Sequence, residues 1–392
     1  MNVIKRLFFN LARLFKLSSS KLLVLLVILL VGGLMVGCAP TTQPRGWSGG
    51  VLADGKLFLG SMEGKLVALN ASGGAQFWST TLETTKQGSS FGCAAPPSSV
   101  AIYGTPAVFE DLVYVGGYNG RISAFNADSG ALRWVYPREG NLEPIVGGLI
   151  VALGRVYFGC SDGKVYALDA PTGDKIWDFP TGNKVWATPT IDGNTLFIGS
   201  FDKKLYAIDA TTGKGKWENP FETQEQGAIV STPLVYNNAV YFGSFDRYFY
   251  AVDATDGHLR WRSEVEAGRL FWAKPIIYNG TVYAPCLDGK VYILSAETGH
   301  EVADAIDLGS PISSSPVLID DAVIVATEAG KVYSLDTKTN ESKLLAELKQ
   351  KILAPLFASD GTVYVHTQEH ETLYALDAQT GAQQWSVGLT SK

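Results

Sequence analysis

The stretch YALDAPTGDKIW, residues 166–177, decides how the chain folds, because similar copies of it return along the sequence. Each copy runs from a short apolar segment through a turn to a bulky residue, in most cases tryptophan. The residue after the Tyr-Ala-Leu triplet aligns in eight copies, at Asn70, Asn126, Asp169, Asp209, Asp253, Ser295, Asp336 and Asp377. The steps between them are 56, 43, 40, 44, 42, 41 and 41 residues. A repeat near forty residues with strand-like composition is typical of the four-stranded blades of a β-propeller.

Eight such units fill residues 47–388, so we predict an all-β fold: an eight-bladed β-propeller of four-stranded antiparallel blades, with no second domain. In the fourth unit, the inner strand is expected at 186–192, the second at 194–200 and the third at 204–210. The outer strand is expected around Trp217. Turn residues such as Asp162-Gly163 separate the second and third strands in several units and favour a tight hairpin.

Tryptophan stands eight residues after the aligned position in six units, as Trp78, Trp134, Trp177, Trp217, Trp261 and Trp385. We expect each indole to fill the gap between neighbouring blades, burying ~200 Å². The aligned Asp or Asn is expected to accept backbone N–H bonds and so tighten the turn. Units six and seven carry Ala303 and Leu344 at the tryptophan position, so their seams are expected to be the loosest.

This string resembles the tryptophan-docking motif of the PQQ-like β-propeller family, and the likeness covers nearly all of residues 47–388. That family holds quinoprotein dehydrogenases and the lipoprotein scaffold of the bacterial outer-membrane barrel assembly machinery. Because the motif is structural, the resemblance implies the fold and leaves both an enzyme and a scaffold open.

The N-terminus is predicted to be a membrane device. Residues 22–37, LLVLLVILLVGGLMVG, form an uncharged apolar run after a basic, amphipathic segment, and the run is short enough for a signal sequence. Gly37-Cys38 resembles a bacterial lipoprotein lipobox in which Cys38 would receive the lipid, although Met35 stands where leucine is usual. An uncleaved anchor is the alternative. Either arrangement places residues 39–46 as a tether and the body outside the cytoplasm, in a bacterial cell envelope.

The charge of the body argues against nucleic acid as a partner. The whole chain has 32 basic and 38 acidic residues, and residues 1–38 hold five of the bases and no acid. The remainder therefore has 27 bases against 38 acids, a net charge of -11. Such a surface repels phosphate backbones.

The sequence offers no catalytic constellation. Dehydrogenases of the resembled family hold PQQ over adjacent cysteines beside a calcium site, and this chain has neither Cys-Cys nor Cys-x-x-Cys-His. Cys160 and Cys286 occupy a small-residue position at the end of a second strand, so we expect them in the core. His366 and His370 have metal-ligand spacing for a helix but lie in a strand and hairpin, so no metal site is predicted.

Ligands of propellers usually sit at one mouth of the central channel. The residues expected at that mouth are Trp47, Tyr103, Val146, Trp186, Val230, Trp272, Ser313 and Ile352. Tyr103, Trp186 and Trp272, with the cations Lys274 and Arg269, could stack on and neutralise a planar anion. The alternative, which we favour, is that these side chains plug the channel. The long insertion at 81–101 lies on the same face and could cap it or reach a partner.

Two functions follow. The favoured one is a membrane-tethered, non-catalytic and monomeric scaffold for other envelope proteins or peptides, with no cofactor. The alternative is a quinoprotein-like enzyme that uses PQQ with calcium, or another small ligand, in the channel.

Overall fold

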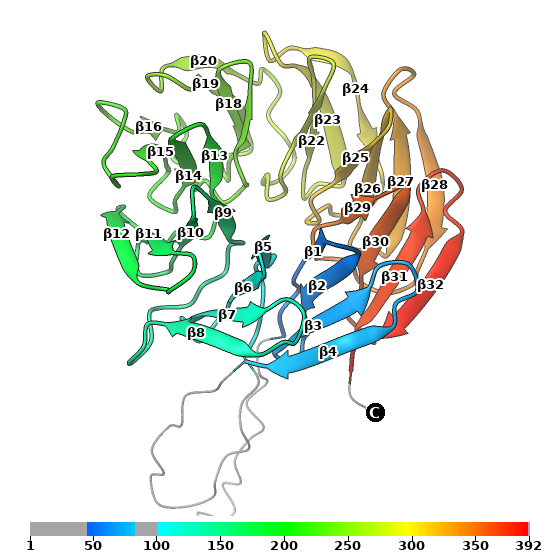
Figure 1. Ribbon diagram of the computed structural model, residues 1–392. Helices are drawn as coiled ribbons and strands as arrows, with labels where there is room; N and C mark the ends of the chain where they lie inside the picture. Colours follow the sequence, from blue (N-terminus) through cyan, green and yellow to red (C-terminus); the bar gives the residue numbers. More distant parts are fainter. Residues whose placement is uncertain (1–44, 83–99, 391–392) are drawn as a thin grey trace, which may run out of the picture. The chain divides into compact units, whose positions relative to one another are not determined.

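The computed structural model describes residues 45–82 and 100–390, and within them eight four-stranded antiparallel sheets form a ring (Figure 1). From the channel outward, blades one to four are β1 (Gly50–Ala53), β2 (Lys56–Gly60), β3 (Lys65–Asn70), β4 (Gln76–Thr81); β5 (Ala107–Phe109), β6 (Leu112–Gly116), β7 (Ile122–Asn126), β8 (Leu132–Tyr136); β9 (Ile150–Ala152), β10 (Arg155–Gly159), β11 (Lys164–Asp169), β12 (Lys175–Pro180); and β13 (Thr190–Asp192), β14 (Thr195–Gly199), β15 (Lys204–Asp209), β16 (Phe221–Glu222).

Blades five to eight are β17 (Leu234–Tyr236), β18 (Ala239–Gly243), β19 (Phe249–Asp253), β20 (Leu259–Arg262); β21 (Ile276–Tyr278), β22 (Thr281–Pro285), β23 (Lys290–Ser295), β24 (Glu301–Asp307); β25 (Val317–Ile319), β26 (Ala322–Ala326), β27 (Lys331–Asp336), β28 (Ser342–Glu347); and β29 (Phe357–Ser359), β30 (Thr362–His366), β31 (Thr372–Asp377), β32 (Gln383–Gly388). The predicted eight-bladed propeller is thus confirmed. The described residues contain no helix long and apolar enough to cross a membrane.

Two strand predictions for the fourth blade were wrong in their bounds. The inner strand begins only at Thr190, since pairing with β14 starts there, after Pro189, which has no N–H to donate. The outer strand is Phe221–Glu222, beyond Pro220, and Trp217 lies in the bends that precede it. A single bridge between Ile208 and Gly215 holds that segment against β15.

The six tryptophans lie at seams between blades, as predicted. Trp177 is the pattern: its Nε1 donates to the carbonyl of Ala210 in the next blade at 3.0 Å, and its ring covers Gly213 of that blade. No side chain fits at Gly213, since a Cβ at that position would lie only 2.6 Å from the indole. Gly213 also has a positive φ of 71°, so glycine is required there twice over. The same bond to the next blade, at 3.0–3.2 Å, is made by Trp78, Trp134, Trp217, Trp261 and Trp385.

The two seams without tryptophan are filled in different ways. Where blade six has Ala303, the glycine of the next blade is replaced by Asn340, whose Oδ1 accepts a bond from the Tyr283 hydroxyl at 3.4 Å. In blade seven the bulge in the outer pair falls two residues earlier on the third strand than in the tryptophan-bearing blades, between Val332 and Tyr333 on β27. Leu344 is therefore 47% exposed, and its neighbour Leu345 packs into the core instead. Leu344, which the alignment puts at the tryptophan position, therefore does not take the place of the indole.

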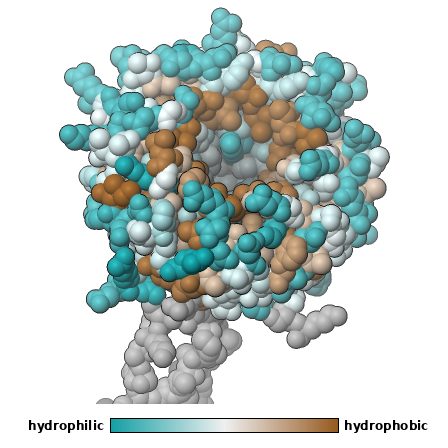
Figure 2. All heavy atoms as spheres, viewed as in Figure 1, coloured by the Kyte–Doolittle hydropathy of each residue, from teal (hydrophilic) through white to brown (hydrophobic). Residues whose placement is uncertain are grey.

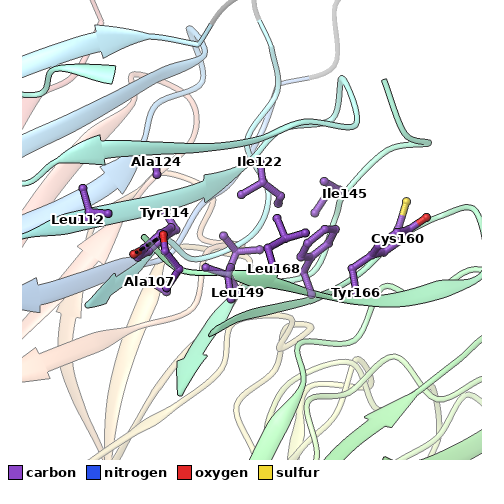
Figure 3. Packing of buried hydrophobic residues seen from close by; sticks show 13 residues of the cluster. Ala107, Leu112, Tyr114, Ile122, Ala124, Ile145, Leu149, Cys160, Tyr166 and Leu168 are labelled. Carbon is purple, nitrogen blue, oxygen red and sulfur yellow. Dashed lines mark hydrogen bonds between the residues drawn. The ribbon is translucent and has the colours of Figure 1, made fainter. Parts of the chain in front are cut away.

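The core is divided among the seams, so each cluster joins two adjacent blades. Figure 3 shows the cluster between blades two and three, where Tyr114, Ile122 and Leu168 pack together and the Tyr114 hydroxyl donates to the Ala170 carbonyl at 3.2 Å. Cys160 lies in this cluster, fully buried, and its Sγ donates to the Glu143 carbonyl. Burial raises the pKa of the Cys160 thiol to about 12. Cys286 has the same surroundings in blade six, so the core role predicted for both is confirmed.

The ring closes without an exchanged strand, because each blade is made from one continuous segment. Between blades eight and one, Trp385 Nε1 donates to the Ala71 carbonyl at 3.2 Å. Beside it, His366 Nδ1 lies 2.9 Å from the Ser48 carbonyl, and the Met62 amide donates to the Glu371 carboxylate. Side chains and backbone bonds across one seam, rather than a shared sheet, therefore hold the ends of the propeller together.

Several predictions fall outside the described residues. These are the lipidated Cys38, the basic amphipathic segment and signal or anchor, and most of the tether at 39–46. Of the insertion predicted at 81–101, residues 83–99 also lie outside. Its ends are part of the propeller, since Thr81 belongs to β4 and Leu82, Val100 and Ala101 are buried.

Candidate functional site

The mouth of the central channel is a hollow of about 540 Å³, including the space open to solvent. Figure 2 shows the ring hollowed at its centre, with hydrophobic side chains around much of the opening. The lining comprises Trp47, Tyr103, Gly104, Thr105, Val146, Gly147, Gly148, Trp186, Thr188, Val230, Thr232, Trp272, Ser313, Ser315, Leu353 and Pro355. Seven of the eight residues predicted at the mouth are among them, and no side chain of this lining is charged.

Close contact between blades below the mouth positions these side chains. The residue after each mouth position is small, and it meets the backbone of the next blade. Ser231 Oγ donates to the Ala273 carbonyl at 3.0 Å, and Ser314 Oγ donates to the Ala354 carbonyl at 2.7 Å. At Gly104, a Cβ would lie 2.2 Å from the Gly147 carbonyl, so no side chain fits there. The mouth residues are thus held on a rigid inner ring.

Three predicted mouth residues lie elsewhere. Lys274 and Arg269 are not part of the lining: Lys274 donates its amide N–H to Ser315 Oγ at 3.1 Å, and Arg269 lies on the exposed segment before it. Burial lowers the pKa of the Lys274 ammonium. Ile352 is fully buried in the core of blades seven and eight, and Leu353 takes its place at the mouth. The prediction for Ile352 was wrong because it was counted three residues back from Pro355, and in blade eight the proline lies only two residues after the mouth position.

The aromatic side chains at the mouth pack against one another in two groups and leave the hollow between them. Trp47 meets Tyr103 edge to face with centroids 4.4 Å apart, and Tyr103 meets Tyr118 at 5.5 Å. On blades four to six, Trp186, Phe201, Phe245 and Trp272 form a continuous row. The rings thus line two walls of the hollow.

The second and third strands of each blade end in hairpins on the same face, and their acids support the turns. Asp202 Oδ1 accepts the Lys204 amide at 3.1 Å, and Oδ2 accepts both the Gly182 amide and the Tyr206 hydroxyl. Burial first, and then the bond to Asp202, raises the pKa of Tyr206 well above its ordinary value. Asp162, Asp246 and Asp288 bond to a tyrosine in the same way. Within the described residues no group of three or more His, Cys, Asp or Glu side chains could hold a metal ion.

A buried polar pair at the closing seam has no counterpart in the sequence prediction. His366 is 2% exposed and Glu371 is 1% exposed, and His366 Nε2 lies 3.7 Å from Glu371 Oε1. The carbonyl of Ser48 can only accept, so His366 carries a proton on Nδ1. Nε2 of His366 and Oε2 of Glu371 have no hydrogen-bond partner. His370 lies exposed in the turn, away from His366.

PQQ does not fit the lining of this hollow. The cofactor is a tricarboxylate, which requires cations or a calcium ion held by carboxylates, and the lining offers only aromatic, aliphatic, glycine and hydroxyl groups.

Comparison with known proteins gives relatives of two kinds. Outer membrane protein assembly factor BamB of Kangiella koreensis is 28% identical over 138 residues, 35% of this chain and 33% of the relative. The protein of the same name from Shewanella oneidensis is 30% identical over 128 residues, 32% of this chain and 28% of the relative. The dehydrogenase subunit of a quinone alcohol dehydrogenase from Gluconacetobacter polyoxogenes is 35% identical over 82 residues, 19% of this chain and 11% of the relative. Each match spans at most about a third of the curated relative's length.

Solved structures share the fold. BamB from Moraxella catarrhalis superposes with a TM-score of 0.66 at 20% identity, over 81% of this chain and 90% of that one. A europium-containing methanol dehydrogenase superposes with a TM-score of 0.62 at 14% identity, over 83% of each chain.

One family model accounts for most of the chain. The family described as outer membrane protein assembly factor BamB matches residues 36–184, 161–306 and 287–392. The chain therefore belongs to this family of PQQ-like β-propellers.

Proposed function

We propose that the chain is a membrane-tethered, extracytoplasmic scaffold that binds other proteins or peptides during assembly of envelope proteins, and that it catalyses no reaction. The observation that carries this proposal is the mouth, where exposed parts of aromatic rings surround a hollow whose lining has no charged side chain. Such a surface suits contacts to apolar side chains better than bond-breaking chemistry. The names of the BamB relatives point the same way.

Photo-crosslinking tests whether the mouth is the binding face. A photoreactive phenylalanine analogue is placed at Phe245 on the mouth or at Leu259 on the outer strand β20, in the full-length chain within its native cells. We expect discrete crosslinks to envelope proteins from position 245 and none of these from position 259. Equal crosslinking from both positions, or crosslinks from neither, would contradict a scaffold that uses this face.

Membrane tethering is tested separately. If Cys38 is lipidated, a palmitate analogue supplied to the cells labels the wild-type chain but not the Cys38→Ser variant. A wild-type chain that stays in the membrane fraction without label would instead support the uncleaved anchor.

The enzyme alternative has its own measurement. Titration of the purified chain with PQQ and calcium should leave the fluorescence of Trp186 and Trp272 unchanged apart from the absorbance of the cofactor. Saturable quenching that is lost in Trp272→Ala would favour a cofactor-binding protein.

A further inference from the structure

Four aromatic residues on blades four to six form one continuous row, which we call the aromatic arc: Trp186, Phe201, Phe245 and Trp272. Trp186 and Phe201 meet edge to face at 4.7 Å, Phe201 and Phe245 at 6.0 Å, and Phe245 stacks on Trp272 at 5.9 Å. All four side chains are half-buried, so each keeps part of its surface exposed. The row matches a segment of at most about five extended residues, at ~3.3 Å per residue.

The arc is held in place by backbone bonds of the inner ring. The Phe201 amide donates to the Lys184 carbonyl and the Phe245 amide donates to the Ala228 carbonyl, both at 2.9 Å. Trp186 Nε1 donates to Ser161 Oγ at 2.9 Å. A partner would therefore meet a preformed surface and would lose little free energy in ordering it.

Polar residues bound the arc on both sides. The position of Phe201 and Phe245 is taken by Ser161 in blade three, by Glu328 in blade seven and by Gln368 in blade eight. Polar residues thus end the arc at blades three and seven and separate it from the second aromatic group, Trp47, Tyr103 and Tyr118, on blades one and two.

Basic groups without acidic partners flank the arc. Lys184 Nζ lies 5.9 Å from the Trp186 ring, and Arg269 is an exposed residue three positions before Trp272. Within the described residues neither side chain has a carboxylate within ion-pair distance, although Arg247 between them pairs with Glu266. The carboxylates next to the arc, Asp202, Asp246 and Asp288, are engaged as acceptors of backbone and tyrosine hydrogens. Lys184 and Arg269 are thus cations beside the arc that have no ion-pair partner among the described residues.

We propose that the aromatic arc docks a short extended segment of a partner protein that carries apolar or aromatic side chains between acidic residues. The apolar side chains pack on Phe201 and Phe245, and the carboxylates face Lys184 and Arg269. This inference rests on the proposed scaffold function and names the chemistry of the partner segment and the blades that receive it.

Fluorescence anisotropy of the full-length chain in detergent micelles tests the proposal with three labelled heptapeptides. The first is Gly-Asp-Phe-Glu-Leu-Asp-Gly, the second replaces its acids with lysine, and the third replaces Phe and Leu with serine. We expect the first to bind at least about tenfold more tightly than either of the others, and to weaken as salt rises from about 0.05 to 0.5 M.

Variants locate the binding site. Phe245→Ala should weaken the acidic probe roughly tenfold, and the double variant Lys184→Glu, Arg269→Glu should reverse the preference toward the lysine probe. The matched controls are Phe77→Ala, an aromatic residue 51% exposed on β4, and Lys343→Glu, an exposed lysine on β28; both should bind like the wild type. Circular dichroism confirms that every variant is folded.

Two results would overturn the proposal: equal binding of the acidic and lysine probes, or equal binding of the acidic probe by the arc variants and the controls. Inorganic polyphosphate that competes fully while the serine probe binds as well as the first would assign a general anion site instead. The photo-crosslinks from position 245 separate a failure of this inference from a failure of the proposed scaffold function. Crosslinks to envelope proteins, without selectivity for the acidic probe, would leave the scaffold function intact and refute only the proposed chemistry of the partner segment.

Discussion

Replacement of one docked tryptophan by alanine should cost a large part of the stability of the propeller. Trp261 is 7% exposed, contacts Tyr241 and Phe249, and donates from Nε1 to the Ala296 carbonyl at 3.0 Å. Removal of a buried Trp or Phe typically costs about 3–5 kcal/mol, of which about 1 kcal/mol here is the hydrogen bond. The cavity cannot collapse, because the next blade presents the bare backbone of Gly299 to the indole.

Urea unfolding of the full-length chain in nonionic detergent, followed by far-ultraviolet circular dichroism, measures this loss. The control is Leu259→Ala in the same strand, where the side chain is 38% exposed and the expected loss is below about 1 kcal/mol. A Trp261→Ala variant within about 1 kcal/mol of the wild type, or one no less stable than Leu259→Ala, would refute the view that the indoles hold the blades together.

Three further predictions concern other parts of the ring. Ala303→Trp alone should destabilise the chain by about 1–3 kcal/mol through overpacking against Asn340, and adding Asn340→Gly should recover this loss in a double-mutant cycle; additive effects would contradict the pairing. The pKa of Tyr206 is raised in the folded state, so its contribution to stability is present below pH 10 and is lost as the pH rises through the folded pKa. Asp202→Asn should lower the pH at which Tyr206 ionises, as followed by absorbance at 295 nm; an unchanged titration would contradict this. Glu371→Ala should lower the free energy of unfolding by about 1–3 kcal/mol and speed hydrogen exchange at the Met62 amide in blade one, which donates to Glu371, while amides of blade four serve as the internal control. An equal increase in exchange in both blades would refute a local role.

The sequence was sufficient to predict the fold because the repeated string contains the tryptophan and the glycine that contact each other between successive blades. Once Trp177 and Gly213 are seen as the two sides of one seam, the blade count and the order of the strands follow from the spacing. The mouth positions of Trp186 and Trp272 follow in the same way, because the distance from the inner ring to the aligned residue is constant wherever the hairpins have equal length.

Errors arose where the spacing or the local chemistry changes within a unit. In blade eight Pro355 lies two residues after the mouth position instead of three, so Leu353 rather than Ile352 lies at the mouth, and the displaced bulge in blade seven places Leu345 rather than Leu344 in the core. Counting back from Thr367, at the end of the second strand, identifies Leu353, whereas nothing in the sequence marks the position of the bulge. The row from Trp186 to Trp272 was missed because Phe201 and Phe245 follow the second strands of their blades, whereas the two tryptophans precede inner strands. These side chains meet only when the blades are packed into the ring.

The closing seam makes the described ring independent of where its chain starts. Since no strand crosses between blades eight and one, the junction there is chemically of the same kind as the five other seams that hold an indole, a carbonyl and a buried cluster. A permuted chain that joined the two ends near Ser48 and Leu389 by a short linker and opened instead at an exposed turn would meet the same set of contacts. The packing contacts thus depend on which blades are neighbours in the ring, and do not depend on which blade comes first in the chain.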